Sequence, residues 1–315
     1  MDPNRYPPLS EGERKCISEV ITPARLGYFA SRFAPAGSDR RTNTPGNRRT
    51  LRKLKEDIED LGPKLRLRSI STPDADGVPF ESVEASLPDR QRAGGPVLVV
   101  AHADATSEVG RAPGRDDNAS GMSALLLVAR AHELLDRGLR TPRRELRYLW
   151  VNGEEQSMLG SMAYARAEHD AGTAFEAVIN VDMIGHESDG DPVFEIHAWC
   201  EDEVTRERSH QLAKFMWAMT SGTRLKPQTL GLIHNWHFSD HLSFMEFGYP
   251  ACAITEDMTR GVHDTGDANP AKHASRDTRI NAEYAASIAQ FVASATWMLA
   301  TRNRFTPLFP ESPLV

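Results

Sequence analysis

Three short apolar runs, each followed by histidine or acidic residues, constrain the fold of this chain more than any other feature. The runs are "PVLVVAH" (96–102), "ELRYLW" (145–150) and "EAVINVD" (176–182). Continuous apolar runs of this length are typical of strands that are covered on both faces. Because such strands occur in parallel sheets with helices on both sides, the pattern predicts an α/β fold.

The rest of the chain alternates between predicted helices and strands. Ser10 and Glu13 have capping-box spacing and begin a predicted helix over 10–33. A loop is expected over 34–49, and then a helix that ends at Gly62-Pro63. Further strands are predicted at 64–71, 96–102, 145–151, 176–182, 192–198 and 250–255, and further helices at 119–136, 159–167, 203–220 and 282–300. We therefore predict a three-layer α/β/α fold with a central mixed, mostly parallel β-sheet.

Composition excludes several classes of function. A content of 40% hydrophobic and 26% charged residues is that of a globular protein, and a net charge of −7 gives no reason to expect nucleic acid or a membrane as partner. No window reaches the roughly 18 apolar residues of a membrane span. The first 15 residues lack an apolar signal core, which predicts a cytoplasmic protein, or a secreted or periplasmic one whose leader has been removed. Three scattered cysteines form no zinc knuckle and no disulfide framework.

The residues at the strand ends form a set that suits a metal. His102 and Asp104, Glu154 and Glu155, and Asp182 each follow one of the apolar runs. In open α/β sheets, sites form beyond the carboxyl ends of the strands, so these segments can converge. Two loops add to the set: "PGRDDNASG" contributes Asp116 and Asp117, and "VHDTGD" contributes His263.

So many carboxylates cannot stay ionised in a partly dry cleft without positive charge. No run of lysine or arginine accompanies the strand ends, and a divalent metal is the economical answer. Imidazole with carboxylate suits zinc best, and cobalt and manganese accept similar ligands. Each motif alone is more often an ordinary turn or surface pair, but their order and their placement at strand ends favour one shared site.

With these motifs, the chain resembles the zinc-dependent aminopeptidases of the M28 metallopeptidase family, which are related to glutaminyl cyclases. The matching segments follow the family's order over 96–267 and are "AHAD", "APGRDDNASG", "NGEEQSMLGS", "NVDMIGH", "SDHLSFMEFGYPA" and "HDTGD". The resemblance implies the zinc-dependent exopeptidase fold in a single catalytic domain over 1–315. Residues 1–48 would pack on this domain as a helix and loop, and no inserted domain is expected.

The resemblance also implies a role for each site residue. His102 and Asp182 would hold one zinc, Glu155 and His263 the other, and Asp117 would bridge the two. Glu154 would be the general base. A cis peptide bond is implied between Asp117 and Asn118.

Supporting and substrate-contacting residues are further expectations. Asp104 is expected to accept the second ring N–H of His102, and Asp240 to support the other metal in a similar way. Arg115 would pair with Asp116 or contact a substrate carboxylate. The oxyanion of the reaction would be stabilised by Trp236, His237 or His234, unless these residues only pack under a loop. Met183, Trp199, Ala253 and Thr255 would line a side-chain pocket or belong to the core.

The function expected from this resemblance is that of a metal-dependent exopeptidase with two zinc ions, which hydrolyses the N-terminal peptide bond of peptides. A glutaminyl-peptide cyclase with one zinc, and a carboxypeptidase or amidohydrolase acting on a small amide, are alternatives on the same scaffold. A non-catalytic scaffold protein is disfavoured, because Glu154 and all five ligand positions are present. The sequence leaves the oligomeric state and the preferred residue open.

Overall fold

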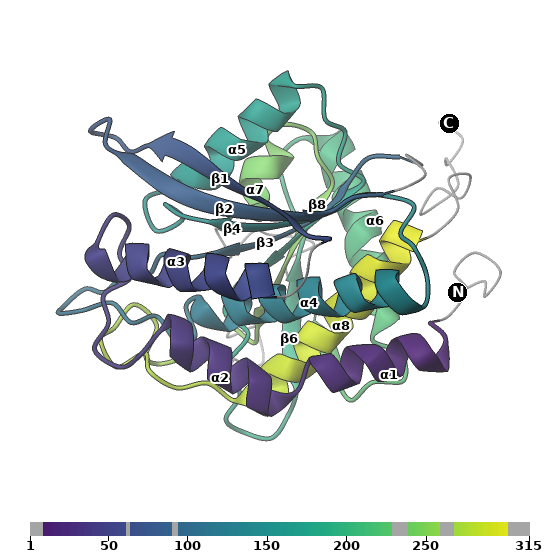
Figure 1. Ribbon diagram of the computed structural model, residues 1–315, viewed down its shortest axis with the longest axis horizontal. Coiled ribbons are helices and arrows are strands. Elements are labelled where there is room, and N and C mark those ends of the chain that lie inside the picture. The colour runs from purple at the N-terminus through teal and green to yellow at the C-terminus, as the bar shows by residue number, and fades with distance from the viewer. Residues whose placement is uncertain (1–8, 61–63, 90–93, 229–238, 259–267, 302–315) are drawn as a thin grey trace.

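A twisted eight-stranded sheet lies between two layers of helices in the computed structural model, which describes residues 9–60, 64–89, 94–228, 239–258 and 268–301 (Figure 1). The strands lie side by side in the order β1-β2-β4-β3-β5-β8-β6-β7. Pairing is parallel from β4 through β3 and β5 to β8, and antiparallel at β1-β2, β2-β4 and β6-β8. The predicted α/β fold with a mixed, mostly parallel sheet is confirmed. The strands are β1 (Arg66–Pro73), β2 (Pro79–Leu87), β3 (Val97–His102), β4 (Leu146–Val151), β5 (Ala177–Val181), β6 (Val193–His197), β7 (Lys226–Gln228) and β8 (Ala251–Glu256).

Eight helices are described, and they cover the two faces of the sheet unequally. On one face, α4 and α8 pack against the central strands, and α1 and α2 pack on these two helices. On the other face lie α5 and α7. The helices are α1 (Glu11–Val20), α2 (Pro23–Phe33), α3 (Pro45–Asp60), α4 (Ala119–Gly138), α5 (Leu159–Asp170), α6 (Glu203–Met219), α7 (His241–Met245) and α8 (Ala282–Thr301). Within the described ranges, no helix combines the length and the apolar character that crossing a membrane requires.

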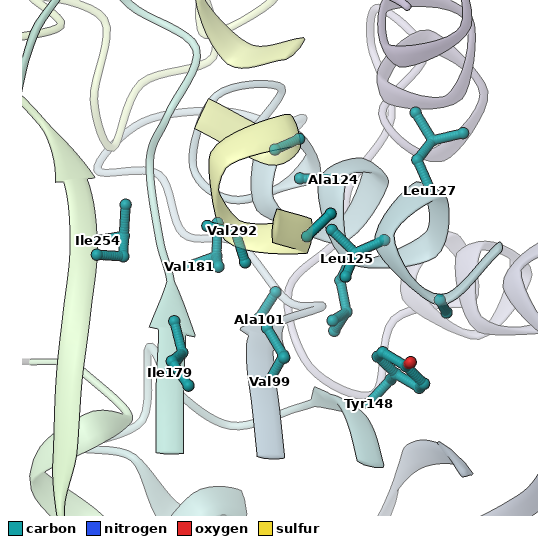
Figure 2. Close-up of a cluster of buried hydrophobic side chains, with 14 of the residues drawn as sticks. Val99, Ala101, Ala124, Leu125, Leu127, Tyr148, Ile179, Val181, Ile254 and Val292 are labelled. Atoms are coloured by element: carbon teal, nitrogen blue, oxygen red, sulfur yellow. The ribbon is translucent and has the colours of Figure 1, made fainter. Parts of the chain in front are cut away.

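The central strands are apolar throughout because both of their faces are covered. Val99 and Ala101 of β3 share a buried cluster with Val292 of α8 (Figure 2). The alternate residues Leu98 and Val100 belong to a second cluster on the side of α5 and α7. Since successive side chains of a strand point to opposite faces, a strand buried on both faces reads as a continuous apolar run.

The predicted helix over 10–33 is two helices in the structure. The capping box of Ser10 and Glu13 is present at the start of α1, as expected. A second start signal lies within the predicted range, because the side chain of Thr22 accepts the N–H of Arg25, and Pro23 opens α2. Because proline has no N–H to donate to the preceding turn, Pro23 cannot extend α1, and α1 ends at Val20.

Two other boundaries differ from the sequence analysis. Helix α3 begins at Pro45, inside the predicted loop, where Thr44 Oγ1 accepts the N–H of Asn47 at 3.1 Å. Strand β2 was not predicted, although polar residues alternate with apolar ones along its second half, a pattern typical of strands. One of these residues, Glu84, is buried and accepts hydrogen bonds from Tyr164 (2.5 Å) and Arg68 (2.9 Å). Strand β7 and helix α7, both short, were also not predicted.

Candidate metal centre

The carboxyl ends of three neighbouring strands bring the predicted ligands together. His102 is the last residue of β3, and Asp182 directly follows β5. The parallel register pairs Val100 with Asn180, so that His102 lies beside Asp182 two residues further along. Glu154 and Glu155 lie in the turn after β4, the neighbour of β3 on its other side.

The first ligand group consists of His102, Asp117 and Asp182. His102 Nε2 lies 3.1 Å from Asp182 Oδ1 and 3.1 Å from Asp117 Oδ1. All three residues are at most 5% exposed, so water cannot screen their charges effectively. Ser239 Oγ donates to the other oxygen of Asp182 at 2.7 Å, which fixes the orientation of this carboxylate.

The second ligand group shares Asp117 with the first. His273 Nε2 lies 3.2 Å from Asp117 Oδ2 and 3.5 Å from Glu155 Oε2. Asp117 therefore directs one carboxylate oxygen at each group. His263, the histidine predicted for this position, lies outside the described residues.

Sequence reasoning missed His273. It stands in "KHASRDT", four residues before Asp277. The buried Asp277 carboxylate accepts the N–H groups of Asp116 (3.1 and 3.2 Å) and Asp117 (3.1 Å). One short segment thus carries both a histidine of the site and the acceptor that holds the Asp117 loop.

Asp104 connects the imidazole of His102 with the turn that carries the two glutamates. Its Oδ1 lies 3.5 Å from His102 Nδ1. Its two oxygens also accept the N–H groups of Gly153 (3.1 Å), Glu154 (3.4 Å) and Glu155 (3.3 Å). The expected hydrogen bond from His102 Nδ1 is not formed at this distance, and Asp104 instead shapes the turn after β4.

Asn118 fixes the Asp117 loop against the segment around Asp182. The peptide bond between Asp117 and Asn118 is cis, as the resemblance implied. Asn118 Nδ2 donates to the carbonyl of Val181 at 2.9 Å, and Oδ1 accepts the N–H of Met183 at 3.2 Å. Met183, a predicted pocket residue, is buried next to Asp182 with a positive φ of 53°.

The remaining predicted residues are placed as follows. Asp240 is fully buried just before α7, and the charges that act on it come from His102, Asp182 and Asp104, so it lies near the first group and not, as expected, near the second. The guanidinium of Arg115 donates two hydrogen bonds to the carbonyl of Ala34, at 3.0 and 3.1 Å, and the expected pairing with Asp116 is not formed. The Asp116 carboxylate is held instead by the backbone of Gly185 and the side chain of Asn269. His234, Trp236 and His237 lie outside the described residues.

The electrostatics of the cluster call for a cation. Burial, and to a smaller extent the neighbouring Asp117, raise the pKa of Glu155 to about 9. Burial also raises the pKa of Glu154 well above its usual range. For His102, burial lowers the pKa, but Asp182 and Glu154 outweigh this effect and raise it well above 6.5. The buried Oε1 of Glu155 accepts no hydrogen bond from any residue that the structure describes.

The donor set fits divalent metal ions. The ligand atoms of three overlapping groups lie within 4.8 Å of one another: His102 with Asp117 and Asp182; Asp117 with Glu155 and His273; and His102 with Glu154 and Glu155. The first two groups each offer one imidazole and two carboxylates, a combination typical of zinc. A divalent ion in each would neutralise the charges that burial otherwise disfavours.

Comparison with known proteins identifies the family of this chain. The model of the family described as Peptidase family M28 matches residues 82–296. A probable leucine aminopeptidase of Arthroderma otae is 29% identical over 202 residues, which cover 62% of this chain and 50% of that protein. The chain thus spans about half the length of this curated relative.

Solved structures share the fold at low sequence identity. The LapA aminopeptidase of Legionella pneumophila has a TM-score of 0.75 at 20% identity, and the match covers 93% of this chain and 75% of that one. A glutaminyl cyclase of Bacteroides thetaiotaomicron has a TM-score of 0.68 at 18% identity, with 88% and 98% covered. Hydrolases and cyclases therefore share this scaffold, and only the site can decide between the two reactions.

Proposed function

Because this chain belongs to peptidase family M28, we propose that it is a zinc-dependent exopeptidase that hydrolyses the N-terminal peptide bond of peptides. The observation that supports this proposal is the pair of ligand groups that share Asp117, with Glu154 beside them. His102 and Asp182 would hold one zinc ion, and Glu155 and His273 would hold a second. Asp117 would contact both. When bound, zinc supplies Lewis acidity, which polarises the scissile carbonyl group and acidifies a neighbouring water.

Glu154 would move the proton of the reaction. It lies next to Glu155 in the turn after β4, and its ligand-type oxygen is close to His102 and Glu155. It does not belong to either group that contains Asp117. A carboxylate in this position can take a proton from the attacking water and pass it to the departing amine. Asp104 accepts the backbone N–H of Glu154 and thereby fixes the turn that positions this carboxylate.

The acidic character of the site favours a substrate with a free α-amine. Asp117, Glu154, Glu155 and Asp182 surround the reaction centre. Lys272 is partly buried near them, and these four carboxylates raise its pKa although burial alone would lower it. Bound zinc would neutralise most of this charge, but carboxylate oxygens that face the centre would still accept hydrogen bonds from the amine at the end of a peptide.

A blocked-amine comparison tests the proposal. The zinc-loaded enzyme is assayed with leucyl anilides that carry a free or an acetylated α-amine, and with a peptide that begins with glutamine. We expect kcat/KM to be at least about 100-fold lower for the acetylated substrate, since one charge-assisted contact is worth about that factor. Equal rates would favour the amidohydrolase, and rapid cyclisation of the glutamine peptide would favour the cyclase.

Metal analysis tests the number of ions separately. The purified enzyme is saturated with zinc, passed over a desalting column and measured by mass spectrometry of the elements. We expect two zinc ions per chain, because two ligand groups are present and Asp117 directs one oxygen at each. A single ion that persists at zinc saturation would contradict the two-ion centre.

A further inference from the structure

A buried pair of titratable residues lies outside the metal centre, on β6. His197 Nε2 is 2.6 Å from Glu195 Oε2, and the two residues are 1% and 0% exposed. Burying a carboxylate and an imidazole in this way carries a desolvation cost that well-packed apolar residues would avoid. Phe194 and Ile196, which alternate with them along the strand, are core residues of the ordinary kind.

The strand register places Glu195 in line with a predicted metal ligand. Val181 of β5 is paired with Ile254 of β8, and the N–H of Asp182 donates to the carbonyl of Ile254. Asp182 therefore lies beside Thr255, which is paired with Glu195 of β6. The three residues form one row across β5, β8 and β6. Two spacings between strands separate the ends of this row by about 10 Å.

The same register puts these side chains on one face of the sheet. Val181, Ile254 and Ile196 all belong to the core on the side of α4 and α8, and Figure 2 shows the first two of them there. Because side chains alternate along a strand, Asp182 and Glu195 both lie on the opposite face. His197 is on that face too, since it follows Glu195 by two residues.

The residues of β8 that lie between Asp182 and the pair of Glu195 and His197 are small. Thr255 separates Asp182 from Glu195, and Ala253 is paired with both Asn180 and His197. Thr255 Oγ1 donates to the carbonyl of Met183 at 3.2 Å, which keeps it close to the backbone. On this face, therefore, no long side chain of β8 stands between the metal centre and the pair.

We propose that Glu195, held in place by His197, recognises the side chain of the first residue of the substrate, and that the enzyme prefers peptides that begin with lysine or arginine. This inference rests on the aminopeptidase function proposed above. A carboxylate has lone pairs enough to accept from His197 and from a substrate ammonium or guanidinium at the same time. The long aliphatic stem of lysine or arginine would lie over Thr255, whereas leucine would bring an apolar group against a buried charged pair.

Substrates that differ in one charged group test this inference. Lysine, arginine, norleucine and leucine anilides are assayed with the zinc-loaded enzyme, because norleucine has an aliphatic chain like that of lysine but no ammonium. We expect kcat/KM for lysine to exceed that for norleucine by about 10- to 100-fold. In Glu195→Gln, which keeps the shape and removes the charge, this ratio should fall to near one.

A matched variant controls for the loss of any buried carboxylate. Glu133 of α4 is 0% exposed and pairs with Arg130 and Arg137. Glu133→Gln should therefore keep the wild-type ratio of lysine to norleucine. A wild-type ratio near one, or an unchanged ratio in Glu195→Gln, would overturn the inference while the aminopeptidase function stood. Failure to cleave any of the four free-amine substrates would instead refute the proposed function itself.

Discussion

The adjacent residues Glu154 and Glu155 have different surroundings at the metal centre. Glu155 lies in a ligand group with Asp117 and His273, whereas Glu154 shares a group only with His102 and Glu155. We predict that Glu154→Gln lowers kcat by about 10²- to 10⁴-fold, because the amide cannot accept a proton, and that zinc content stays near wild type. Glu155→Gln should lose one zinc ion and regain part of its activity when zinc is added. Zinc loss in the Glu154 variant with retention in the Glu155 variant would reverse the two assignments.

A second residue-scale prediction decides between two histidines. His273 approaches Asp117 and Glu155 in the structure, and His263 lies outside the described residues. We predict that His273→Ala reduces the zinc content from two ions to one, since the second group loses its imidazole. His263→Ala, the same substitution ten positions earlier, should keep both ions. Measured by metal analysis at equal zinc, the opposite pattern would restore His263 as the ligand.

At the scale of elements, the segment between α2 and α3 supports the site from outside the region that the family model matches. Arg40 is fully buried and donates to the carbonyls of Ala103 (2.9 Å), Pro113 (2.7 Å) and Asp117 (3.3 Å). Thr42 Oγ1 donates to Asp104 Oδ2 at 2.9 Å. The loop between β3 and α4 is therefore fixed by residues far upstream of it.

Two threonine variants test this support. Thr42→Val removes a donor to Asp104, which holds the turn of Glu154, and we predict a fall in kcat of about 10-fold with little change in KM. Thr50→Val removes a similar hydroxyl that lies away from the site and donates to the carbonyl of Phe33 at 2.8 Å. It should lower the free energy of unfolding by about 1 kcal/mol and leave kcat unchanged. Thr42→Ser should restore kcat, and equal kcat in both valine variants would show that Thr42 has no special role.

At the scale of the whole molecule, one buried histidine joins strands and helices from both halves of the sequence. His132 Nε2 donates to the carbonyl of Ala293 of α8 at 2.9 Å, so Nδ1 accepts from the hydroxyl of Tyr148 of β4 at 2.8 Å. Its ring centroid lies 5.3 Å from that of Trp297, whose Nε1 donates to Glu13 of α1 at 2.9 Å. Burial lowers the pKa of His132 to about 4, and the neutral ring is therefore the folded form.

This histidine makes stability depend on pH. Its contribution is fully present above the unfolded pKa of about 6.5 and is lost as pH falls toward 4, because the unfolded chain takes up the proton first. The loss amounts to about 3 kcal/mol. Urea unfolding of the metal-free protein at pH 7.5 and pH 5 should show a smaller loss for His132→Gln than for wild type. His169→Gln, at an exposed histidine, should behave as wild type. Parallel losses in all three proteins would contradict this role.

By itself, the sequence determined the class of fold and indicated which residues would gather at one edge of the sheet. Continuous apolar runs such as 96–102 indicate strands covered on both faces, because burial imposes a period that can be read locally. His102, Asp104, Glu154, Glu155 and Asp182 follow such runs, so their convergence could be predicted from the geometry of parallel sheets alone. The start of a second helix at Pro23 is also predictable from the sequence, because a capping threonine stands directly before this proline.

Only the tertiary structure decided which residues from distant segments complete the site. His273 Nε2 lies 3.2 Å from Asp117 Oδ2, a contact that the local sequence of His273 does not indicate. Arg115 binds Ala34, a partner 81 positions away that its neighbours do not indicate. Glu195 comes into line with Asp182 through the register of β6 against β8. Such contacts depend on how whole elements pack, and a local pattern of hydrophobicity does not encode that packing.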